Sequence, residues 1–425
     1  MLNNKEILDL RNKYLGPSLS VSYDVPIHIV RGKGQYLFDA KGNRYLDCVN
    51  NIQHVGHCHP KVIEAAKNQY EKLNTNTRYL DETIVNYAKN ITSTLPDGLE
   101  VCFFANSGSE ANDLALRLAR QFVGDKATIV LDGAYHGHLL SLIEISPYKH
   151  NGPGGQGAPD FVYTLPMPDS FRGKYRGVNC REKYVKEVRT VINEIQKKGE
   201  KVSTIIVEAL MGCGGQLILP KGFLKKAFNL VRDAGGVCIA DEIQIGFGRV
   251  GSHFWGFEID GVVPDIVTMG KSMGNGHPLS AVITTREIAD SFNNGMEYFN
   301  SFGGNAVSCA VGQAVLDVIK EEGLQKNALE VGSYLLNQLK ELQNQHDIIG
   351  EVRGSGLFIG IELVKDELIP AADEAQNIVN QLKDRGFLLS TDGPDHNVIK
   401  IKPPLVFNKG NADELVEKID KRISK

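Results

Sequence analysis

The chain has 425 residues, enough to bury a large core, and this length predicts two domains. A formal net charge of −4 argues against nucleic acid or an anionic membrane surface as a partner, and no apolar run approaches the length of a membrane span. Seven cysteines without a CxxC pair, and an N-terminus without an apolar signal core, predict a reduced protein of the cytoplasm.

The N-terminal segment, residues 1–60, is predicted to form a helix and short strands that pack with the smaller domain. It ends in QHVGHCHP, whose side chains offer a candidate metal cluster: His54, His57, Cys58 and His59. No second group of ligands accompanies this cluster, and Pro60 starts a helix directly after it. We therefore expect a tight turn here and no metal site.

The middle of the chain, residues 61–315, alternates amphipathic helices with short apolar strands. The predicted strands are residues 101–105, 128–132, 161–165, 204–209, 237–241, 265–269 and 279–285. This alternation is typical of α/β proteins and predicts a large three-layer αβα domain with a mostly parallel sheet. Residues 316–425 are predicted to form a smaller α+β domain.

The strand 237–241 ends in Asp241, and the apolar run that contains the strand 265–269 ends in Lys271. In an open α/β sheet, ligands bind at the C-terminal edge of the strands. One interpretation is a buried ion pair between the two side chains. The other is a lysine used for Schiff-base chemistry, with the aspartate holding the ring nitrogen of a cofactor.

An anion site is predicted between the strand 101–105 and the helix that follows it. Ser107 and Glu110 have the spacing of a capping box, Gly108 permits close backbone approach, and the helix N-terminus offers N–H groups to a phosphate. An ordinary capped helix is the alternative.

Residues 152–157 match GxGxxG, but no strand precedes them and no helix follows, so a nicotinamide cofactor is not expected.

Three more side chains belong to the same sheet edge. Tyr135 could stack on a flat ring, Glu208 ends a strand, and Gln244 could donate a hydrogen bond to an oxygen on the ring. A phosphate site, a stacking aromatic, an acid and a lysine are what pyridoxal phosphate requires.

The chain resembles the class III (omega) aminotransferases, pyridoxal 5'-phosphate enzymes of fold type I, over nearly its whole length. The matching stretches are GHCHP, NSGSEAND, AYHGH, VEA, ADEIQIGFGRVG, DIVTMGKSMGNGHP and FGGN. The resemblance implies catalytic roles for Lys271, which forms the Schiff base, and for Asp241, which pairs with the ring nitrogen. It also implies a cofactor-binding set, in which Ser301 reaches the neighbouring subunit's phosphate: Ser107, Gly108, Ser109, Tyr135, His136, Glu208, Asp241, Gln244, Lys271 and Ser301. A homodimer, or a dimer of dimers, with shared active sites is implied as well.

Two departures from the family pattern concern the substrate. Cys213 stands where such enzymes often have a gating glutamate, and Lys400 stands where many have an arginine that clamps a carboxylate. RGKYR, NNIQHVGHCHP, RLARQF and ISPYK are similar to the branch of phospho-lyases acting on O-phosphoethanolamine or 5-phosphohydroxylysine. The candidate ligands of a substrate phosphate are Arg78, Arg172, Lys174, Arg176 and Lys400, although 172–176 also fits a solvated charge run.

We therefore predict a lyase that eliminates phosphate from a phosphorylated primary amine, releasing an aldehyde and ammonia. An omega-aminotransferase that passes the amino group to a keto acid is the first alternative. A cofactor-binding protein without turnover is the second, and the pairing of Asp241 with Lys271 speaks against it.

Overall fold

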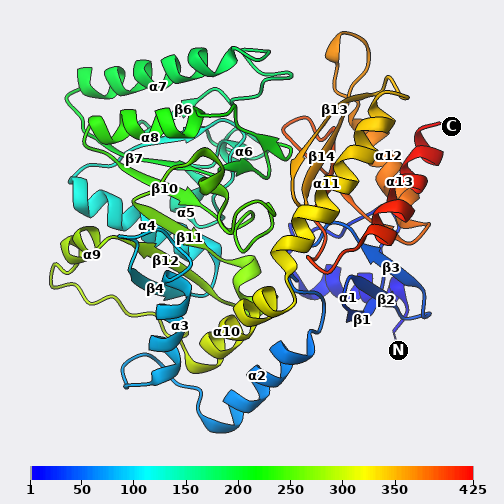
Figure 1. Ribbon diagram of the computed structural model, residues 1–425, viewed down its shortest axis with the longest axis horizontal. Coiled ribbons are helices and arrows are strands. Elements are labelled where there is room, and N and C mark those ends of the chain that lie inside the picture. The colour runs from blue at the N-terminus through cyan, green and yellow to red at the C-terminus, as the bar shows by residue number, and fades with distance from the viewer. Residues whose placement is uncertain (1, 425) are drawn as a thin grey trace.

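The computed structural model describes residues 2–424 and has one lobe built on a large sheet and a second lobe built on smaller sheets (Figure 1). The large sheet contains, in spatial order, β4 (Val101–Ala105), β12 (Ser280–Thr284), β11 (Ile266–Met269), β10 (Val237–Asp241), β7 (Val202–Val207), β5 (Ala127–Leu131) and β6 (Val162–Leu165). Only β12 runs antiparallel to its neighbours in this sheet. The α/β class and the mostly parallel sheet predicted from the sequence are confirmed.

Helices cover both faces of the large sheet, as the alternation of side chains along each strand requires. Ile206 packs in one apolar cluster with residues of α4 (Gly108–Val123). Its neighbour Ile205 packs on the opposite face with residues of α7 (Cys180–Lys197) and α8 (Phe223–Asp233). The strands are therefore buried on both sides, which explains their continuous apolar runs.

The second lobe holds two sheets and joins the two ends of the chain. An antiparallel sheet contains β13 (Ile349–Ser355), β14 (Phe358–Leu363), β17 (Val398–Ile401) and β16 (Ser390–Asp392). The other contains β1 (Ile29–Lys33), β2 (Tyr36–Asp39), β3 (Arg44–Asp47) and β15 (Phe387–Leu388). Because β3 pairs with β15, the N-terminal strands and the C-terminal part of the chain share one sheet.

A pair of helices connects the lobes. α10 (Ala306–Glu321) leads to α11 (Leu324–Gln343) through Gly323, whose φ of 61° lies in the left-handed region that favours glycine. The expected boundary at 315/316 falls inside α10, so the helix break lies a few residues further on. The division into domains stays a prediction.

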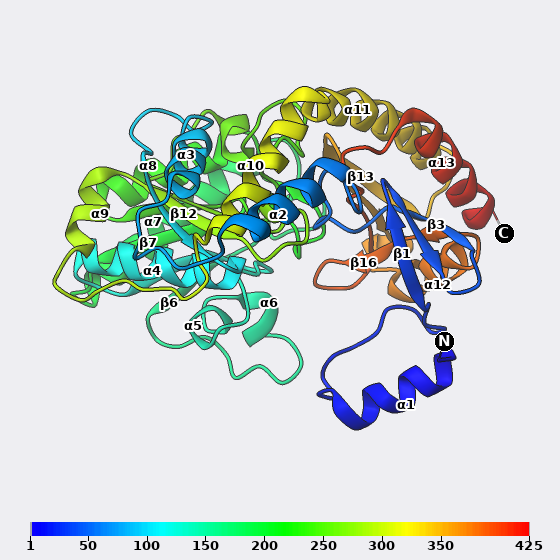
Figure 2. The ribbon, with the colours of Figure 1, turned by 90° about the horizontal axis from the view of Figure 1, so that it is seen from below.

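The remaining elements frame these lobes. They are α1 (Asn4–Tyr14), α2 (Pro60–Lys72), α3 (Glu82–Thr92), α5 (Leu140–Ile143), α6 (Pro147–His150), α9 (Arg286–Phe292), α12 (Ala372–Lys383), α13 (Lys409–Ile423), β8 (Leu210–Met211), β9 (Leu217–Ile218) and the 3₁₀ turns η1 (Gly256–Asp260), η2 (Lys271–Gly274) and η3 (Asp366–Leu368). α1 has no buried residue and stands apart from the body of the molecule (Figure 2). Within residues 2–424, every helix is too short or too polar to cross a membrane.

The histidines of the QHVGHCHP segment each contact a different part of the protein. His54 Nε2 lies 2.7 Å from the carbonyl of Phe247, and His57 Nε2 lies 2.7 Å from an oxygen of Asp47. In the described part of the chain, no group of three or more potential ligands is arranged to hold a metal ion.

Candidate active site

A cavity of about 450 Å³ opens at the C-terminal edge of the large sheet. Its walls come from the ends of β4, β5, β7, β10 and β11, as expected for a ligand site in an open α/β sheet. The residues that line it are Ile52, Asn106, Ser107, Gly108, Ser109, Tyr135, His136, Gly137, His138, Glu208, Asp241, Ile243, Gln244, Lys271, Gly276, His277, Pro278 and Leu279. All the predicted cofactor-binding residues except Ser301 are among them.

Lys271 begins the η2 turn directly after β11, at a φ of 36°. A positive φ is unfavourable for a lysine, and such strain is tolerated mostly where function requires the conformation. Within residues 2–424 the Lys271 amine has no hydrogen-bond or ion-pair partner, although it lines the cavity beside Asp241. The buried ion pair considered from the sequence is therefore not formed, and the amine is available for chemistry.

Asp241 ends β10 and is held by two other side chains. Asn112 Nδ2 donates to Oδ2 over 2.8 Å, and His136 Nδ1 lies 2.8 Å from the same oxygen. The backbone N–H of Ile243 donates to Oδ1 over 3.2 Å. These contacts fix the orientation of a carboxylate that is only 4% exposed. An anionic group held this way suits a cationic partner in the cavity.

The start of α4 provides an anion site. Ser107 is the N-cap, and its hydroxyl accepts the N–H of Glu110 over 3.2 Å. The expected capping box forms only in part, because the Glu110 carboxylate accepts the N–H of Asn106 rather than that of Ser107. Within residues 2–424 the N–H groups of Gly108 and Ser109 have no acceptor, so both are available to a phosphate at the positive end of the helix.

Glu208 lies deep in the cavity wall, and burial followed by the Asp241 charge raises its pKa to about 7. Its Oε2 accepts the N–H of Gly212 over 3.0 Å and faces Gln244 Nε2 at 3.5 Å. Its Oε1 is buried without a partner in the described residues, as is His136 Nε2. Unsatisfied buried polar atoms at a cavity indicate that a polar ligand completes the site.

Tyr135 is half-buried in the cavity lining, where burial and the neighbouring Cys213 raise its pKa. Its ring meets Tyr148 edge to face, with centroids 6.1 Å apart. The amine of Lys149 lies 5.7 Å from the centre of the Tyr135 ring. Contacts with Tyr148 and Lys149 of α6 thus support the Tyr135 ring in the cavity wall, where an aromatic ring could stack on a flat ligand.

Together these groups fit pyridoxal 5'-phosphate. The free lysine matches its aldehyde, the fixed carboxylate its ring nitrogen, the start of α4 its phosphate and the tyrosine its ring face. The individual contacts of these residues with the cofactor stay predictions.

The residues predicted to bind a substrate phosphate lie outside this cavity lining. Arg78 pairs with Glu297, Lys174 with Glu187, and Lys400 with Asp392 at 3.0, 2.7 and 3.1 Å. Arg172 pairs with Glu362 and Asp395, and Arg176 is exposed. Ser301 is exposed as well. None of these six residues lines the cavity, and their roles stay predictions.

Three residues of the site were not identified from the sequence: Asn112, Asn51 and Lys402. Asn112 lies one turn into α4 from Gly108, so helical spacing places both on one face of the helix. Lys402 follows Lys400 by two positions at the end of β17, so strand alternation places both lysines on one side. No local pattern identifies Asn51, whose Nδ2 donates to Gln244 Oε1 over 3.1 Å.

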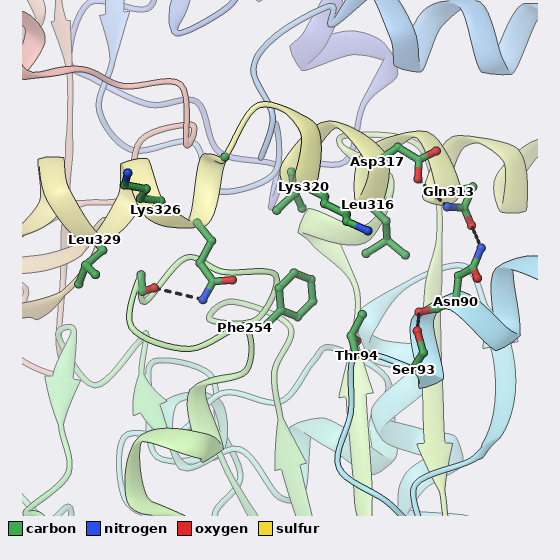
Figure 3. Close-up of a pocket in the computed structure, with 14 residues that line it drawn as sticks. Asn90, Ser93, Thr94, Phe254, Gln313, Leu316, Asp317, Lys320, Lys326 and Leu329 are labelled. Carbon is green, nitrogen blue, oxygen red and sulfur yellow. Dashed lines mark hydrogen bonds between the residues drawn. The ribbon is translucent and has the colours of Figure 1, made fainter.

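A larger cavity of about 720 Å³ lies at the junction of α10 and α11 (Figure 3). Phe254, Leu316 and Leu329 supply apolar wall, and the carboxylate on its rim, Asp317, accepts a hydrogen bond from Gln313. The lining residues include no histidine, cysteine or buried acid that could perform acid–base chemistry. The cavity at the sheet edge is therefore the candidate active site despite its smaller size.

Comparisons with known proteins agree with this geometry. A family model described as Aminotransferase class-III matches residues 19–423. The Drosophila melanogaster protein "Alanine–glyoxylate aminotransferase 2-like" is 51% identical, over 98% of this chain and 86% of its own. The Caenorhabditis elegans protein "Ethanolamine-phosphate phospho-lyase homolog 1" is 44% identical, over 98% and 93%.

Among solved structures, a phospholyase from Arthrobacter in complex with phosphoethanolamine is similar, with a TM-score of 0.94 and 38% identity, covering 99% of both chains. An amine transaminase from an uncultivated Pseudomonas species in its PLP-bound form has a TM-score of 0.87 and 27% identity, covering 97% of this chain and 98% of its own.

Proposed function

The chain belongs to the class III aminotransferase family of fold-type I enzymes, which use pyridoxal 5'-phosphate, and within this family we propose that it is a phospho-lyase. Its substrate would be O-phosphoethanolamine or 5-phosphohydroxylysine, and the products an aldehyde or its equivalent, ammonia and inorganic phosphate. The similarity to a phospho-lyase homologue and to a phospholyase that binds phosphoethanolamine supports this proposal.

The observation that carries the proposal is the pair of lysines at the end of β17. Lys402 is 1% exposed, and among residues 2–424 it has no carboxylate within ion-pair distance. It faces Lys271, Lys400, Asp392 and Cys213, and burial followed by the Lys400 charge lowers its pKa to about 7. In the described part of the chain, no arginine lines the cavity. Lys400 pairs with Asp392, so Lys402 is the cation on this side of the site that has no carboxylate partner among residues 2–424. A lysine lacks the planar fork that suits a carboxylate and is suited to a phosphate.

The chain's own residues then have distinct tasks. When bound, the cofactor supplies an aldehyde that captures a primary amine and a ring that accepts the electron pair of a carbanion. The Lys271 amine is free to remove the proton from the amine-bearing carbon. Lys400 and Lys402 provide the positive field that stabilises the phosphate as it departs from the adjacent carbon. The start of α4 and Asp241 hold the cofactor in place.

The proposal includes a homodimer, or a dimer of dimers, with shared active sites. Ser301 lies on a segment with the exposed apolar side chains of Met296 and Phe302, which are 71% and 70% exposed. Neighbouring exposed apolar side chains support an interface at this segment.

Purified holoenzyme incubated with O-phosphoethanolamine should release inorganic phosphate and acetaldehyde in equal amounts, measured colorimetrically and with an aldehyde-reducing coupled assay. 5-Phosphohydroxylysine is the second substrate to test. Ethanolamine, which has a hydroxyl in place of the phosphate, is the matched control and should yield no acetaldehyde. Absence of phosphate release from both phosphorylated amines would contradict the proposal.

An omega-aminotransferase remains the second candidate, because the 51% identical relative carries an aminotransferase name. Transfer of the amino group from alanine to glyoxylate, measured as glycine formed, would support it.

The pH dependence of kcat/KM provides a further prediction. Lys402 is a cation only below its pKa of about 7, so the attraction for a phosphate is present at lower pH and is lost as the pH rises through 7. Wild-type kcat/KM for O-phosphoethanolamine should therefore fall on the alkaline side of neutrality. In Lys402→Met, kcat/KM should be about 100-fold lower and this alkaline limb should be missing. A limb that persists in the variant would belong to another group, of which Glu208 is the nearest in pKa.

A further inference from the structure

The side-chain amide of Gln244 lies between the cavity and Lys402. Its Oε1 accepts two hydrogen bonds, from Lys402 Nζ over 2.8 Å and from Asn51 Nδ2 over 3.1 Å. Its Nε2 lies 3.5 Å from Glu208 Oε2, at the limit of a hydrogen bond. Gln244 lines the cavity, whereas Lys402 stands behind it. The amide oxygen is therefore saturated, while the amide nitrogen is nearly unoccupied.

The orientation of this amide follows from the chemistry of its neighbours. An amide can rotate by half a turn, which exchanges its oxygen and its NH₂ group, and the surrounding donors and acceptors decide between the two states. Below its pKa of about 7, Lys402 is protonated and can only donate. In the rotated state, Lys402 would face an NH₂ group and lose its hydrogen bond in a buried place, which is strongly unfavourable. Lys402 thus selects the state in which Nε2 faces the Glu208 side of the cavity.

The backbone near Gly212 restricts other orientations of the Gln244 amide. A Cβ atom built on Gly212 would lie 2.5 Å from Gln244 Nε2, so the amide packs close to the backbone of the turn that follows β8. Asn51 comes from the N-terminal part of the chain and Lys402 from the C-terminal part, so two distant segments hold the same oxygen.

The burial of the Lys402 amine lowers the stability of the fold, so its presence calls for a functional reason. It is fully buried, it makes one hydrogen bond to a neutral acceptor within the described residues, and it lies close to two other lysines. A buried cation without a carboxylate partner destabilises a protein, and such groups are retained mainly at functional sites.

We propose that Lys402 is a positioning residue that fixes the Gln244 amide with its Nε2 directed into the cavity, where it donates to the ring oxygen of the bound cofactor. Asn51 is the second member of this support. The role is independent of the reaction, because it holds whether the enzyme eliminates phosphate or transfers an amino group.

The test is the pH titration of the visible absorbance of the holoenzyme, which needs no substrate. A hydrogen bond donated to the ring oxygen stabilises its anionic form, so losing that bond should raise the midpoint of the spectral transition. We expect Lys402→Met and Gln244→Met each to raise the midpoint by about one unit. We expect the double variant to shift it no further than Gln244→Met alone, because Lys402 acts through the amide.

Two more variants keep the result interpretable. Lys149→Met removes a positive charge near Tyr135 without touching Gln244, and its midpoint should stay close to that of the wild type. Asn51→Ala removes the other donor to the amide oxygen, and its shift should be upward, smaller and absent in the Gln244→Met background. If Lys402→Met does not fold, Lys402→Leu, which also has no donor for the amide oxygen, takes its place with the same expected shift.

Additive shifts in the double variant would overturn the proposal, because they would mean that Lys402 acts on the cofactor directly through its charge. An unchanged midpoint in a folded Lys402→Met protein would overturn it too. Neither outcome bears on the lyase assignment, which is tested by phosphate release.

Discussion

Replacement of Lys271 by alanine is expected to lower turnover by about 10⁴-fold, the upper range for removing a general base, and to abolish the visible band of the covalently bound cofactor. The physical reason is that the Lys271 amine lines the cavity beside Asp241, and no other lysine of residues 2–424 lines it. Stopped-flow or steady-state assays of phosphate release, together with absorbance spectra before and after borohydride reduction, measure both effects.

Two matched variants separate chemistry from charge. Lys271→Arg keeps a cation at the cavity but cannot form an imine, so it should be as inactive as Lys271→Ala. Lys320→Ala, at the α10–α11 cavity, removes a lysine from the other large cavity and should retain wild-type activity. Turnover in Lys271→Ala within tenfold of wild type would show that another group provides the amine.

Replacement of Asp241 by asparagine is expected to lower kcat by about 10³-fold, within the range for a group that stabilises charge during reaction. Asparagine has nearly the same shape and can keep its oxygen toward Asn112 and His136, while the negative charge and the acceptor for the N–H of Ile243 are lost. Without that charge, the cofactor's ring nitrogen has no anionic partner and the ring withdraws electrons less effectively.

The control for this variant is Asp317→Asn, which removes a carboxylate at the α10–α11 cavity and should leave kcat unchanged. Melting temperature distinguishes a chemical effect from unfolding, because Asp241→Asn should unfold within a few degrees of the wild type. A folded Asp241→Asn protein with wild-type kcat would contradict the assigned role.

The sequence predicted much of the fold because the relevant signals are local. The strands of the large sheet are short apolar runs, most of them buried, and Asp241 ends β10 while Lys271 follows β11. In parallel strands such ends meet at one edge of the sheet, so the spatial grouping of the site could be inferred without coordinates. By contrast, β12 runs antiparallel to both of its neighbours. Its direction depends on the path of the chain between β11 and β12, and the pattern of apolar residues does not indicate that path.

The supporting residues could not be inferred in the same way. Asn51 and Gln244 are 193 positions apart, and Lys402 and Gln244 are 158 positions apart. Only the packed tertiary structure shows that these side chains meet. The basic residues at 172–176 show the opposite case, because the charges are evident in the sequence but their carboxylate partners are not. Arg172 pairs with Glu362, which lies 190 residues away.

The measurement that tests the central claim most directly is the number of phosphate ions released per active site from O-phosphoethanolamine when no keto acid is present. A lyase regenerates itself in each cycle, so the account predicts many phosphates per site and a linear time course. An aminotransferase retains the amino group after one half-reaction. A reaction that releases no phosphate, or that stops at one turnover per site until pyruvate or glyoxylate is added, would contradict the account.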